Sequence, residues 1–384
     1  MMKKKLLGLL LDISLAASIV AAVWILCYVL PQKGIKAVPL EAVSQEARAA
    51  GNTTTGIETT STEWQNTQNY AISGNHVVGA GIDKLQKNAS NPVSGGLLGG
   101  QLQKTDIVRD ETDWHEKFAD KFTDTVVSTD TTYSSPNLSI ELSYRQYDTG
   151  KLDTSSDGKH EKYGTRISYV LADIYVSDIT CFQTAFAQDT YGVGYDEKLS
   201  DMSDRMKAVL SVNGDSYNNN RHKDNGTIIR NGVIYRNRAT DVETCVLNWD
   251  GTVDIYPPGK IDENELIHKG AYQSWVFGPS LLDDNGKAKP SFITWDYICE
   301  SHPRTALGYY EPGHYCLLLV DGRQKASRGM FLDEMAKVFE DLGCTSAYNL
   351  DGGHCSFMTF QGNVANHPYK PDHGVADGIM IKEM

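Results

Sequence analysis

An aspartate followed by two glycines ends an apolar run near the C-terminus, in the segment YNLDGGHCSF. Gly352 and Gly353 allow a tight turn and let backbone N–H groups approach a ligand closely, which suits an anionic or hydroxylated group. Asp351 would then stand at the end of a strand, where its carboxylate could support a positive centre or activate water. An ordinary turn that begins with Asp has the same composition.

A second aspartate and an arginine follow the apolar run HYCLLLV, in the segment LVDGRQKASRGM. Arg323 could make a bidentate contact with a phosphate, and Asp321 could hold a sugar hydroxyl or act as an acid or base. Ser327 is one of the small residues before the next helical pattern. A surface Asp-Gly turn is the competing interpretation.

A polar segment, SVNGDSYNNN, comes directly after the apolar run VLSV. In it, Asp215 is flanked by the amide of Asn213 and the phenol of Tyr217, with Gly214 beside it. Carboxylate, amide and phenol groups together are typical of a site that holds a sugar. A loop rich in turn-forming residues accounts for the same composition.

Two arginines and several histidines complete the candidates. Arg238 in YRNRAT and Arg304 in HPRTALGYY could add positive charge, although a lone arginine is more often solvated or structural. No histidine or cysteine spacing matches a standard zinc pattern, so neither a metal nor a cofactor is expected. The catalytic candidates are Asp215, Asp321, Asp351, Arg304 and Arg323, and the substrate-binding candidates are Asn213, Gly214, Tyr217, Arg238, Ser327, Asn349, Gly352, Gly353 and His354.

A strand, a helix and a second strand must position the two C-terminal aspartates. The run at 314–320, a helical pattern over 330–342 that ends at Gly343, and the segment TSAYNL predict this unit. If the two strands are parallel neighbours, a right-handed crossover brings Asp321 and Asp351 to one edge of the sheet.

Hairpins are predicted in the middle of the chain. Asn231-Gly232 and Asp250-Gly251 each separate two strand-like runs. Further strands are expected at 138–143 and 167–176, after a short helical pattern at 114–127. The fold class is therefore α+β, a mixed sheet with antiparallel hairpins and a C-terminal strand-helix-strand unit.

The N-terminus predicts a membrane anchor. Three lysines at 3–5 precede an apolar run at 13–30, which is long enough for a helix that crosses a hydrocarbon core of roughly 30 Å. Lysines on the cytoplasmic side place the remainder outside the cell, and a cleaved signal peptide is the alternative. The predicted organisation is an anchor at 1–31, a flexible stalk rich in Ser, Thr and Gly at 32–105, and a folded domain at 106–384.

The 384 residues carry a formal net charge of −13. This charge argues against nucleic acid as a partner, because a polyanion needs a clustered basic face. An acidic enzyme that acts on an anionic substrate must concentrate its positive charge in the pocket. Of the seven cysteines, one lies in the predicted anchor, and the others fit either disulfides outside the cell or buried small side chains.

Taken together, the segments resemble the phosphodiester glycosidase family. The resemblance is carried, in the family's order from about residue 111 onward, by VNGDSY, IIRNGVIYRN, SWVFGPSLL, HPRTALGYY, LLVDGRQKASRGM, AYNLDGGHCSFM and FQGNVANHP. It implies hydrolysis of sugar-1-phosphodiesters and, for bacterial members, a role in exopolysaccharide or the cell envelope. The family commonly has a third glycine and a serine after LDGG. Here His354 and Cys355 replace them, so His354 could narrow the pocket, supply a proton or hydrogen-bond the phosphate.

We therefore expect an extracellular, single-pass membrane hydrolase that releases a sugar from a sugar-1-phosphodiester in a cell-envelope glycan or polymer. N-Acetylglucosamine is the first candidate sugar. In this hypothesis Arg304 and Arg323 neutralise the phosphate, and Asp215, Asp321 or Asp351 supports the oxocarbenium-like centre or activates water. Two alternatives stay open, a metal-dependent phosphodiesterase that cleaves the P–O bond and a non-catalytic module that binds a wall polymer.

Overall fold

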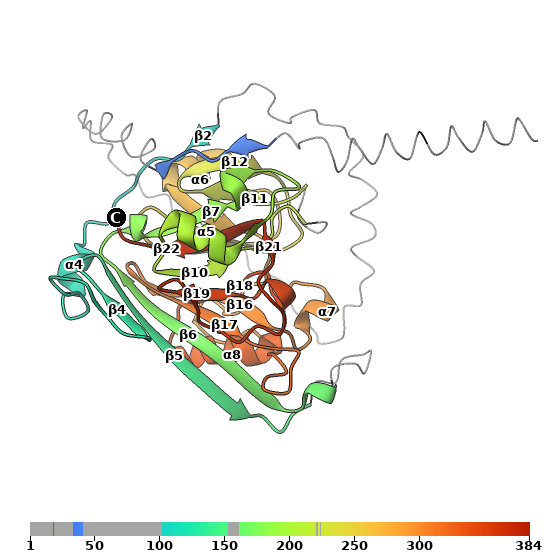
Figure 1. Cartoon of the computed structure of the whole chain (residues 1–384). Coiled ribbons are helices and arrows are strands. Elements are labelled where there is room, and N and C mark those ends of the chain that lie inside the picture. The colour runs from blue at the N-terminus through green and yellow to red at the C-terminus, as the bar shows by residue number, and fades with distance from the viewer. Residues whose placement is uncertain (1–17, 19–33, 41–101, 153–160, 220–221, 223) are drawn as a thin grey trace, which may run out of the picture.

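The computed structural model describes residue 18 and residues 34–40, 102–152, 161–219, 222 and 224–384 (Figure 1). Within these ranges the protein is rich in strands and has few helices, so the predicted α+β class is confirmed. None of the helices in these ranges combines the length and the apolar character needed to cross a membrane. The predicted anchor at 13–30 lies, apart from residue 18, outside the described residues.

The largest sheet of the described structure has seven strands. In spatial order its strands are β18 (Ser346–Asn349), β16 (Arg304–Glu311), β17 (His314–Val320), β6 (Arg166–Val176), β5 (Leu138–Asp148), β4 (Thr132–Ser134) and β3 (Val127–Ser128). Strands β5 and β6 extend the predicted runs at 138–143 and 167–176. All neighbouring strands in this sheet are antiparallel.

This topology corrects the prediction of a mixed sheet, in which β17 and β18 would have been parallel neighbours. β16 lies between β17 and β18 and is antiparallel to both. A tight hairpin with Gly313 at φ 87° places β16 on one side of β17, while β6 occupies the other side. Strand β18 can therefore pair only with the far side of β16. β17 and β18 still run in the same direction, so both end at the same edge.

The remaining strands form smaller antiparallel sheets. A five-stranded sheet contains β20 (Asn363–Val364), β19 (Met358–Phe360), β10 (Leu210–Asn213), β22 (Asp377–Ile381) and β7 (Phe182–Phe186). Two three-stranded sheets contain β11 (Thr227–Arg230), β12 (Val233–Asn237) and β2 (Gln103–Lys104), and β14 (Val253–Tyr256), β13 (Thr244–Asn248) and β15 (Ala271–Trp275). Two strand pairs join β1 (Ile35–Lys36) to β8 (Thr190–Tyr191) and β21 (Gly374–Val375) to β9 (Glu197–Lys198).

Helices are short except for one. The α-helices of the described ranges are α4 (Trp114–Lys117), α5 (Leu199–Met206), α6 (Glu263–Lys269), α7 (Asp296–Cys299) and α8 (Leu332–Leu342). Single 3₁₀ turns occur at Glu161–Tyr163, Ile179–Cys181, Ala187–Asp189 and Gly353–Cys355. The helical pattern predicted at 114–127 is realised only as α4, because the chain turns after Lys117 and reaches β3.

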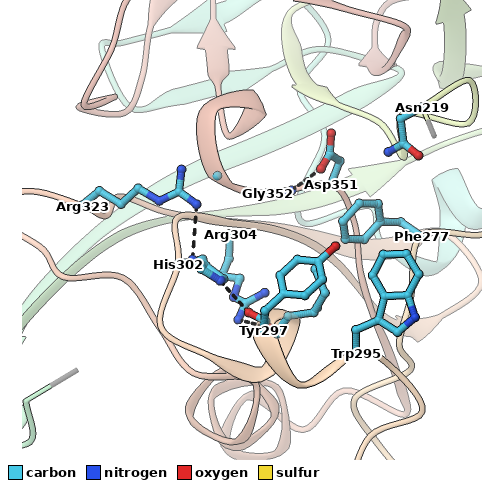
Figure 2. A pocket seen from close by; sticks show the side chains of 11 residues that line it. Asn219, Phe277, Trp295, Tyr297, His302, Arg304, Arg323, Asp351 and Gly352 are labelled. Atoms are coloured by element: carbon cyan, nitrogen blue, oxygen red, sulfur yellow. Dashed lines mark hydrogen bonds between the residues drawn. The ribbon is translucent and has the colours of Figure 1, made fainter. Parts of the chain in front are cut away.

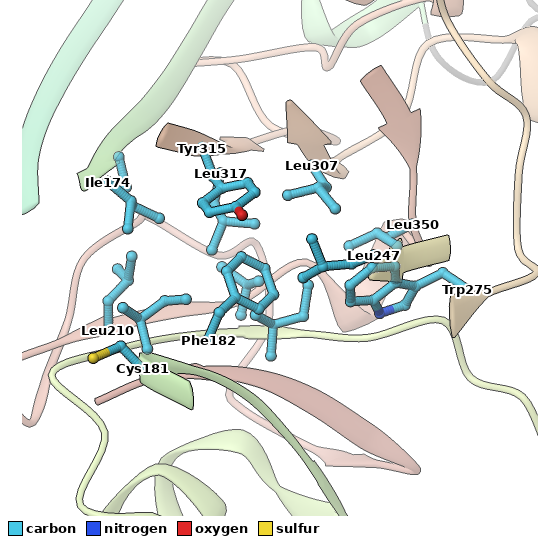
Figure 3. Packing of buried hydrophobic residues seen from close by; sticks show 14 of the residues in the cluster. Ile174, Cys181, Phe182, Leu210, Leu247, Trp275, Leu307, Tyr315, Leu317 and Leu350 are labelled. Atoms are coloured by element: carbon cyan, nitrogen blue, oxygen red, sulfur yellow. The ribbon is translucent and has the colours of Figure 1, made fainter. Parts of the chain in front are cut away.

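Strand β17 separates the two halves of the core. Cys316, Leu318 and Val320 face α8, whose Met335 and Phe339 are fully buried against them. Tyr315, Leu317 and Leu319 point to the other face and pack against β7 and β10 (Figure 3). This alternation follows from the period of two in a strand. The seven-stranded sheet therefore lies between α8 and the five-stranded sheet (Figure 1).

Both predicted hairpins are present, but only the first has the predicted two-residue turn. Asn231 and Gly232 have φ values of 52° and 77° between β11 and β12, as the two central residues of a type I′ hairpin turn require. Asp250-Gly251 also lies in a hairpin, between β13 and β14, but in a longer loop at 249–252. Gly343 ends α8 in the left-handed region, at φ 79°.

Two ends of the predicted stalk contact the folded body. β1 pairs with β8, and the Val38 backbone N–H donates to the Tyr235 hydroxyl at 2.8 Å. β2 pairs with β12, and the buried Thr105 hydroxyl donates to the Ala271 carbonyl at 2.8 Å. Residues 34–40 and 102–105 are therefore parts of the folded body, while 41–101 lie outside the described residues.

Candidate active site

A cavity of about 480 Å³ opens where β16 begins and β18 ends. Its lining consists of Asn219, Phe277, Trp295, Tyr297, Ile298, His302, Arg304, Arg323, Asp351, Gly352 and Gly353. Figure 2 shows the rings of Phe277, Trp295 and Tyr297 on one side of the cavity, with His302 and Arg323 on the other. The pocket thus has an aromatic half and a cationic half, and Asp351 is part of its lining.

Strand register explains why these residues meet. Arg304 begins β16 and pairs with Val320, the last residue of β17, and Ala306 pairs with Asn349, the last residue of β18. The start of one strand and the ends of its two antiparallel neighbours therefore share an edge. Arg323 and Asp351 leave from that edge in the loops that follow β17 and β18.

The turn at Asp351 is anchored to β10 through backbone groups. The Asn213 amide donates to the Asp351 carbonyl at 2.7 Å, and the Asp351 backbone N–H donates to the Gly214 carbonyl at 3.2 Å. The Asn213 side-chain oxygen accepts from the Thr305 hydroxyl at 2.7 Å. The buried Asn213, at the end of β10, therefore connects β10 to the Asp351 turn, although Asn213 itself does not line the pocket.

The Asp351 carboxylate is surrounded by donors. One oxygen accepts from the Gly352 backbone N–H at 2.9 Å, and the other accepts from the Ser216 hydroxyl. Burial raises the Asp351 pKa above its ordinary value, while hydrogen bonds from Ser216, Cys355 and Gly352 oppose the rise. The three donors that converge on the carboxylate therefore stabilise its ionised form and offset part of the cost of burial.

Arg304 is a buried cation held by carbonyl groups. Its guanidinium donates to the carbonyls of Met330 at 3.0 Å, Ile298 at 2.5 Å and Glu300. Burial lowers the Arg304 pKa to about 9, and the nearby positive charge of Arg323 adds to the shift. Within the described ranges, no carboxylate forms an ion pair with Arg304 or Arg323.

Arg323 reaches the pocket from a loop residue with φ 56°. It donates to the Tyr369 hydroxyl at 2.8 Å and lies 3.4 Å from the Nδ1 atom of His302. The other ring nitrogen of His302 is 2.7 Å from the Tyr297 carbonyl, so that nitrogen carries the proton in a neutral ring. Nδ1 then accepts from Arg323 and orients it. An anion between Arg304 and Arg323 would relieve their mutual repulsion.

The sequence comparison agrees with this geometry. Residues 206–382, a little under half of the chain, match the family model described as phosphodiester glycosidase. This segment belongs to the phosphodiester glycosidase family. The match contains the polar segment after β10, both pocket arginines and the Asp351 turn.

Individual relatives of the phosphodiester glycosidase domain are distant. An SPbeta prophage-derived uncharacterized protein of Bacillus subtilis (strain 168), YomE, is 31% identical over 193 residues, which are 49% of this chain and 29% of that protein. The chain therefore spans less than a third of this relative's length.

Two solved structures are similar to the chain at low identity. The catalytic domain of zebrafish N-acetylglucosamine-1-phosphodiester alpha-N-acetylglucosaminidase, auto-inhibited by its pro-peptide, has a TM-score of 0.49 and 19% identity over 65% of this chain and 90% of its own. A hypothetical protein from Synechocystis has a TM-score of 0.46 and 12% identity over 64% of this chain and 62% of its own.

The structure brings together five of the residues predicted from the sequence. These are Arg304, Arg323, Asp351, Gly352 and Gly353. His354 follows Gly353 in the sequence but is not part of the lining; its ring lies 5.8 Å from that of Tyr369.

Asp215 and its neighbours lie elsewhere in the phosphodiester glycosidase domain. Asp215 is fully buried, accepts from the Val276 backbone N–H at 2.7 Å and pairs with Arg230, which also binds Asp377. Gly214 lies against the Asp377 carboxylate, which a Cβ would approach to 2.5 Å. The buried Tyr217 contacts Gly192 rather than the cavity.

Asp321 and Ser327 support the loop that carries Arg323. Asp321 accepts from the Asn366 amide and the His367 backbone N–H, each at 3.0 Å, and the Ser327 hydroxyl donates to the Asp321 carbonyl at 2.6 Å. Burial raises the Asp321 pKa. Among the other candidates, Asn349 donates to the buried Gly278 carbonyl at 2.7 Å, and the exposed Arg238 lies 3.9 Å from Asp224.

Six residues of the pocket lining, and Ser216 next to it, were not predicted as site residues; the six are Asn219, Phe277, Trp295, Tyr297, Ile298 and His302. Ser216 stands inside the polar segment that was singled out, yet its hydroxyl meets Asp351 only in the fold. Its φ of 50° marks a strained backbone, as residues at functional sites often have. Trp295 and Tyr297 lie shortly before the HPRTALGYY segment and His302 is its first residue, so aromatic residues near Arg304 were the available signal.

No described group of three or more His, Cys, Asp and Glu side chains is placed to hold one metal ion. Residues outside the described ranges are not part of that finding.

Proposed function

We propose that the phosphodiester glycosidase domain hydrolyses a sugar-1-phosphodiester at the bond between the anomeric carbon and oxygen. Water supplies the new sugar hydroxyl, and the phosphate leaves as a monoester of the group that was attached to it. The observation that carries this proposal is a pocket with two guanidinium groups, Arg304 and Arg323, that lack carboxylate partners in the described structure, next to the carboxylate of Asp351.

In this proposal the two pocket arginines bind the phosphate. Arg323, which His302 orients, would donate to the phosphate. Arg304 would add a buried positive charge, and burial lowers the pKa of its guanidinium to about 9. Neutralising the phosphate at this place stabilises the charge that develops on the leaving oxygen. Because a phosphate is a good leaving group, this reaction depends less on a general acid than ordinary glycoside hydrolysis does.

Asp351 would act in its ionised form. The hydrogen-bond donors around it suit a carboxylate that activates water or stabilises the oxocarbenium-like centre. The aromatic half of the pocket offers ring faces against which the apolar side of a sugar can pack. N-Acetylglucosamine is the first sugar to test.

The setting of this reaction is also part of the proposal. The apolar run at 13–30 would anchor the chain, with the domain outside the cell and a cell-envelope glycan or polymer as its substrate. Protease treatment of intact cells tests this topology, because only an external domain is cleaved without breaking the membrane.

The decisive experiment is hydrolysis of a methyl diester of N-acetylglucosamine 1-phosphate by the purified full-length chain in ¹⁸O-labelled water. We expect the label in the released sugar and none in the phosphate, with and without a chelator. Label in the phosphate would establish cleavage of the P–O bond instead. Binding of the diester without turnover would support a non-catalytic binding module.

Variants separate the active site from contaminating activity. Asp351→Asn should abolish the label in the sugar, because an amide can neither activate water nor supply negative charge. Asp201→Asn, an exposed change on α5, is the matched control and should retain the wild-type rate.

A further inference from the structure

Beyond Arg323, the mouth of the pocket carries a set of basic and aromatic side chains. We call this set the cationic rim; it consists of Arg323, His354, His367, Tyr369, Lys370 and His373, from the loops after β17, β18 and β20. Arg323 also lines the pocket, so the rim continues directly from the proposed phosphate site.

Tyr369 lies at the centre of the rim. Its hydroxyl accepts from Arg323 at 2.8 Å, and its ring lies 5.4 Å from the Arg323 guanidinium carbon and 5.6 Å from the Lys370 ammonium nitrogen. The His354 ring is 5.8 Å from Tyr369 and 3.8 Å from His373. Two permanent positive charges and one imidazole therefore lie close to the Tyr369 ring, and the second imidazole contacts the first.

In the described structure the two permanent positive charges of the rim, Arg323 and Lys370, have no carboxylate partner, although the His367 ring lies close to Asp321. Asp372 is next to the rim but accepts from the Ser200 backbone N–H and hydroxyl, at 3.0 and 2.7 Å. Asp321 is buried and lies 3.7 Å from a ring nitrogen of His367.

The surroundings of His354 disfavour a further positive charge. Burial and the neighbouring His373, Lys370 and Arg323 lower the His354 pKa, while the hydrogen bond to the Pro371 carbonyl opposes the shift. Cations that repel one another across an open surface are stabilised when an anion binds between them. In a chain with a net charge of −13, such a patch at the mouth of a pocket is suited to attracting an anionic ligand.

We propose that the cationic rim binds a second phosphate group, carried by the part of the substrate that leaves with the first one. The preferred substrate is then an oligomer or polymer with repeated phosphates, rather than an isolated diester. This inference rests on the proposed function, because it assigns the phosphate that is cleaved to Arg304 and Arg323.

A kinetic comparison tests the rim. Two diesters of N-acetylglucosamine 1-phosphate are compared. In one the phosphate carries a methyl group, and in the other it carries glycerol phosphate, which adds a second phosphate group to the part that leaves. The full-length wild-type chain should prefer the glycerol phosphate diester by about tenfold in kcat/KM at low salt, and the preference should shrink as salt screens the charges. Equal rates for the two diesters in the wild type would overturn the proposal.

Two variants locate the effect. Lys370→Ala and His354→Ala should each lower the preference by about 3- to 10-fold, because each removes one partly exposed charge or donor from the rim. Lys337→Ala, an exposed lysine on α8 whose partners are Asp341 and Glu340, is the matched control and should keep the preference. A preference that Lys370→Ala and His354→Ala both leave intact would contradict the assignment.

A binding experiment keeps the two proposals apart. If neither diester is hydrolysed, the proposed function fails, but the rim can still be tested by titrating a glycerol phosphate trimer into the full-length Asp351→Asn protein. Binding that weakens severalfold on adding Lys370→Ala supports the rim, whereas binding that is absent or insensitive to this change refutes it.

Discussion

At the residue scale, the two pocket arginines differ in what else they do. Arg304 is almost fully buried, and its guanidinium holds the carbonyls of Ile298 and Glu300 at α7. Its removal would damage the fold together with the pocket. Arg323 is partly exposed and has one neutral hydroxyl and one histidine as partners, so it is the better residue for testing charge at the phosphate.

Arg323→Ala should lower kcat/KM for a sugar-1-phosphodiester by about 100- to 1,000-fold, because it removes a charge that acts on the leaving phosphate. Thermal unfolding should change little. The matched control is Arg238→Ala, an exposed arginine 3.9 Å from Asp224, which should stay within twofold of the wild type. Steady-state kinetics of both variants test this prediction. Equal losses of kcat/KM in the two variants would show that Arg323 is not part of the site.

Ser216 tests the ionisation of Asp351. In Ser216→Gly the backbone N–H that donates to Asp377 is retained and φ 50° suits glycine, but the hydroxyl donor is lost. Since that hydrogen bond lowers the Asp351 pKa, its removal should raise the pKa further. We expect kcat to fall about 10-fold near neutral pH.

The pH profile distinguishes this role from a structural one. If the ionised carboxylate is active, wild-type kcat falls as pH decreases through an Asp351 pKa that lies above 3.8. The acidic limb should move to higher pH in Ser216→Gly, so the loss is greater at pH 5 than at pH 8. An unchanged acidic limb would show that Ser216 does not control Asp351.

At the scale of elements, the turn after β18 depends on its close approach to β16. A Cβ on Gly352 would lie 2.7 Å from the Pro303 carbonyl oxygen, one residue before Arg304. The turn also donates from the Gly353 backbone N–H to that carbonyl at 2.9 Å. The spacing between Asp351 and Arg304 is therefore determined by backbone contact.

Gly352→Ala should push this turn away from β16 and displace Asp351. Displacement of a reacting group by about 1 Å is expected to lower kcat by about 100-fold, whereas stability should fall by only about 1–3 kcal/mol. Gly362→Ala is the control, because Gly362 also lies in a turn but has open space around it. It should lose about 1 kcal/mol of stability to backbone strain and keep its turnover. Similar kinetics in the two variants would disprove the argument.

At the scale of the whole molecule, Arg230 joins three sheets. It extends from β11, pairs with Asp377 of β22 and with Asp215 after β10, and donates to the Ser274 carbonyl of β15 at 2.5 Å. Burial and the neighbouring Asp377 raise the Asp215 pKa, while Arg230 opposes the rise. Two buried carboxylates thus depend on one guanidinium.

Arg230→Met should destabilise the protein by about 3–5 kcal/mol at neutral pH, because two buried charges lose their partner. Because the Asp215 pKa is raised in the folded protein, this carboxyl favours the folded state below pH 3.8 and loses that advantage as pH rises. The destabilisation should therefore be smaller at pH 4.5 than at pH 7.5, as measured by urea unfolding. Arg205→Met, which breaks a partly exposed pair with Glu197, should cost about 1 kcal/mol or less. Equal losses in both variants would contradict this account.

The sequence alone determined the features that depend on neighbours along the chain. The buried face of α8, its end at Gly343, the alternation of β17 and the Asn231-Gly232 turn follow from local periodicity and backbone preference. The LDGG and DGR segments could also be identified from the sequence, because charged residues and glycines directly after apolar strands form a recognisable local pattern.

Only the tertiary structure decided which candidates meet. Asp215 and Asp351 are both aspartates after buried strands, but the first is enclosed with Arg230 and Asp377 while the second faces the pocket. Ser216 reaches Asp351 across 135 positions of sequence, and β18 lies beyond β16 because both sides of β17 are occupied. Such long-range pairings depend on which surfaces are already covered when the chain folds, and no local pattern of residues encodes that order.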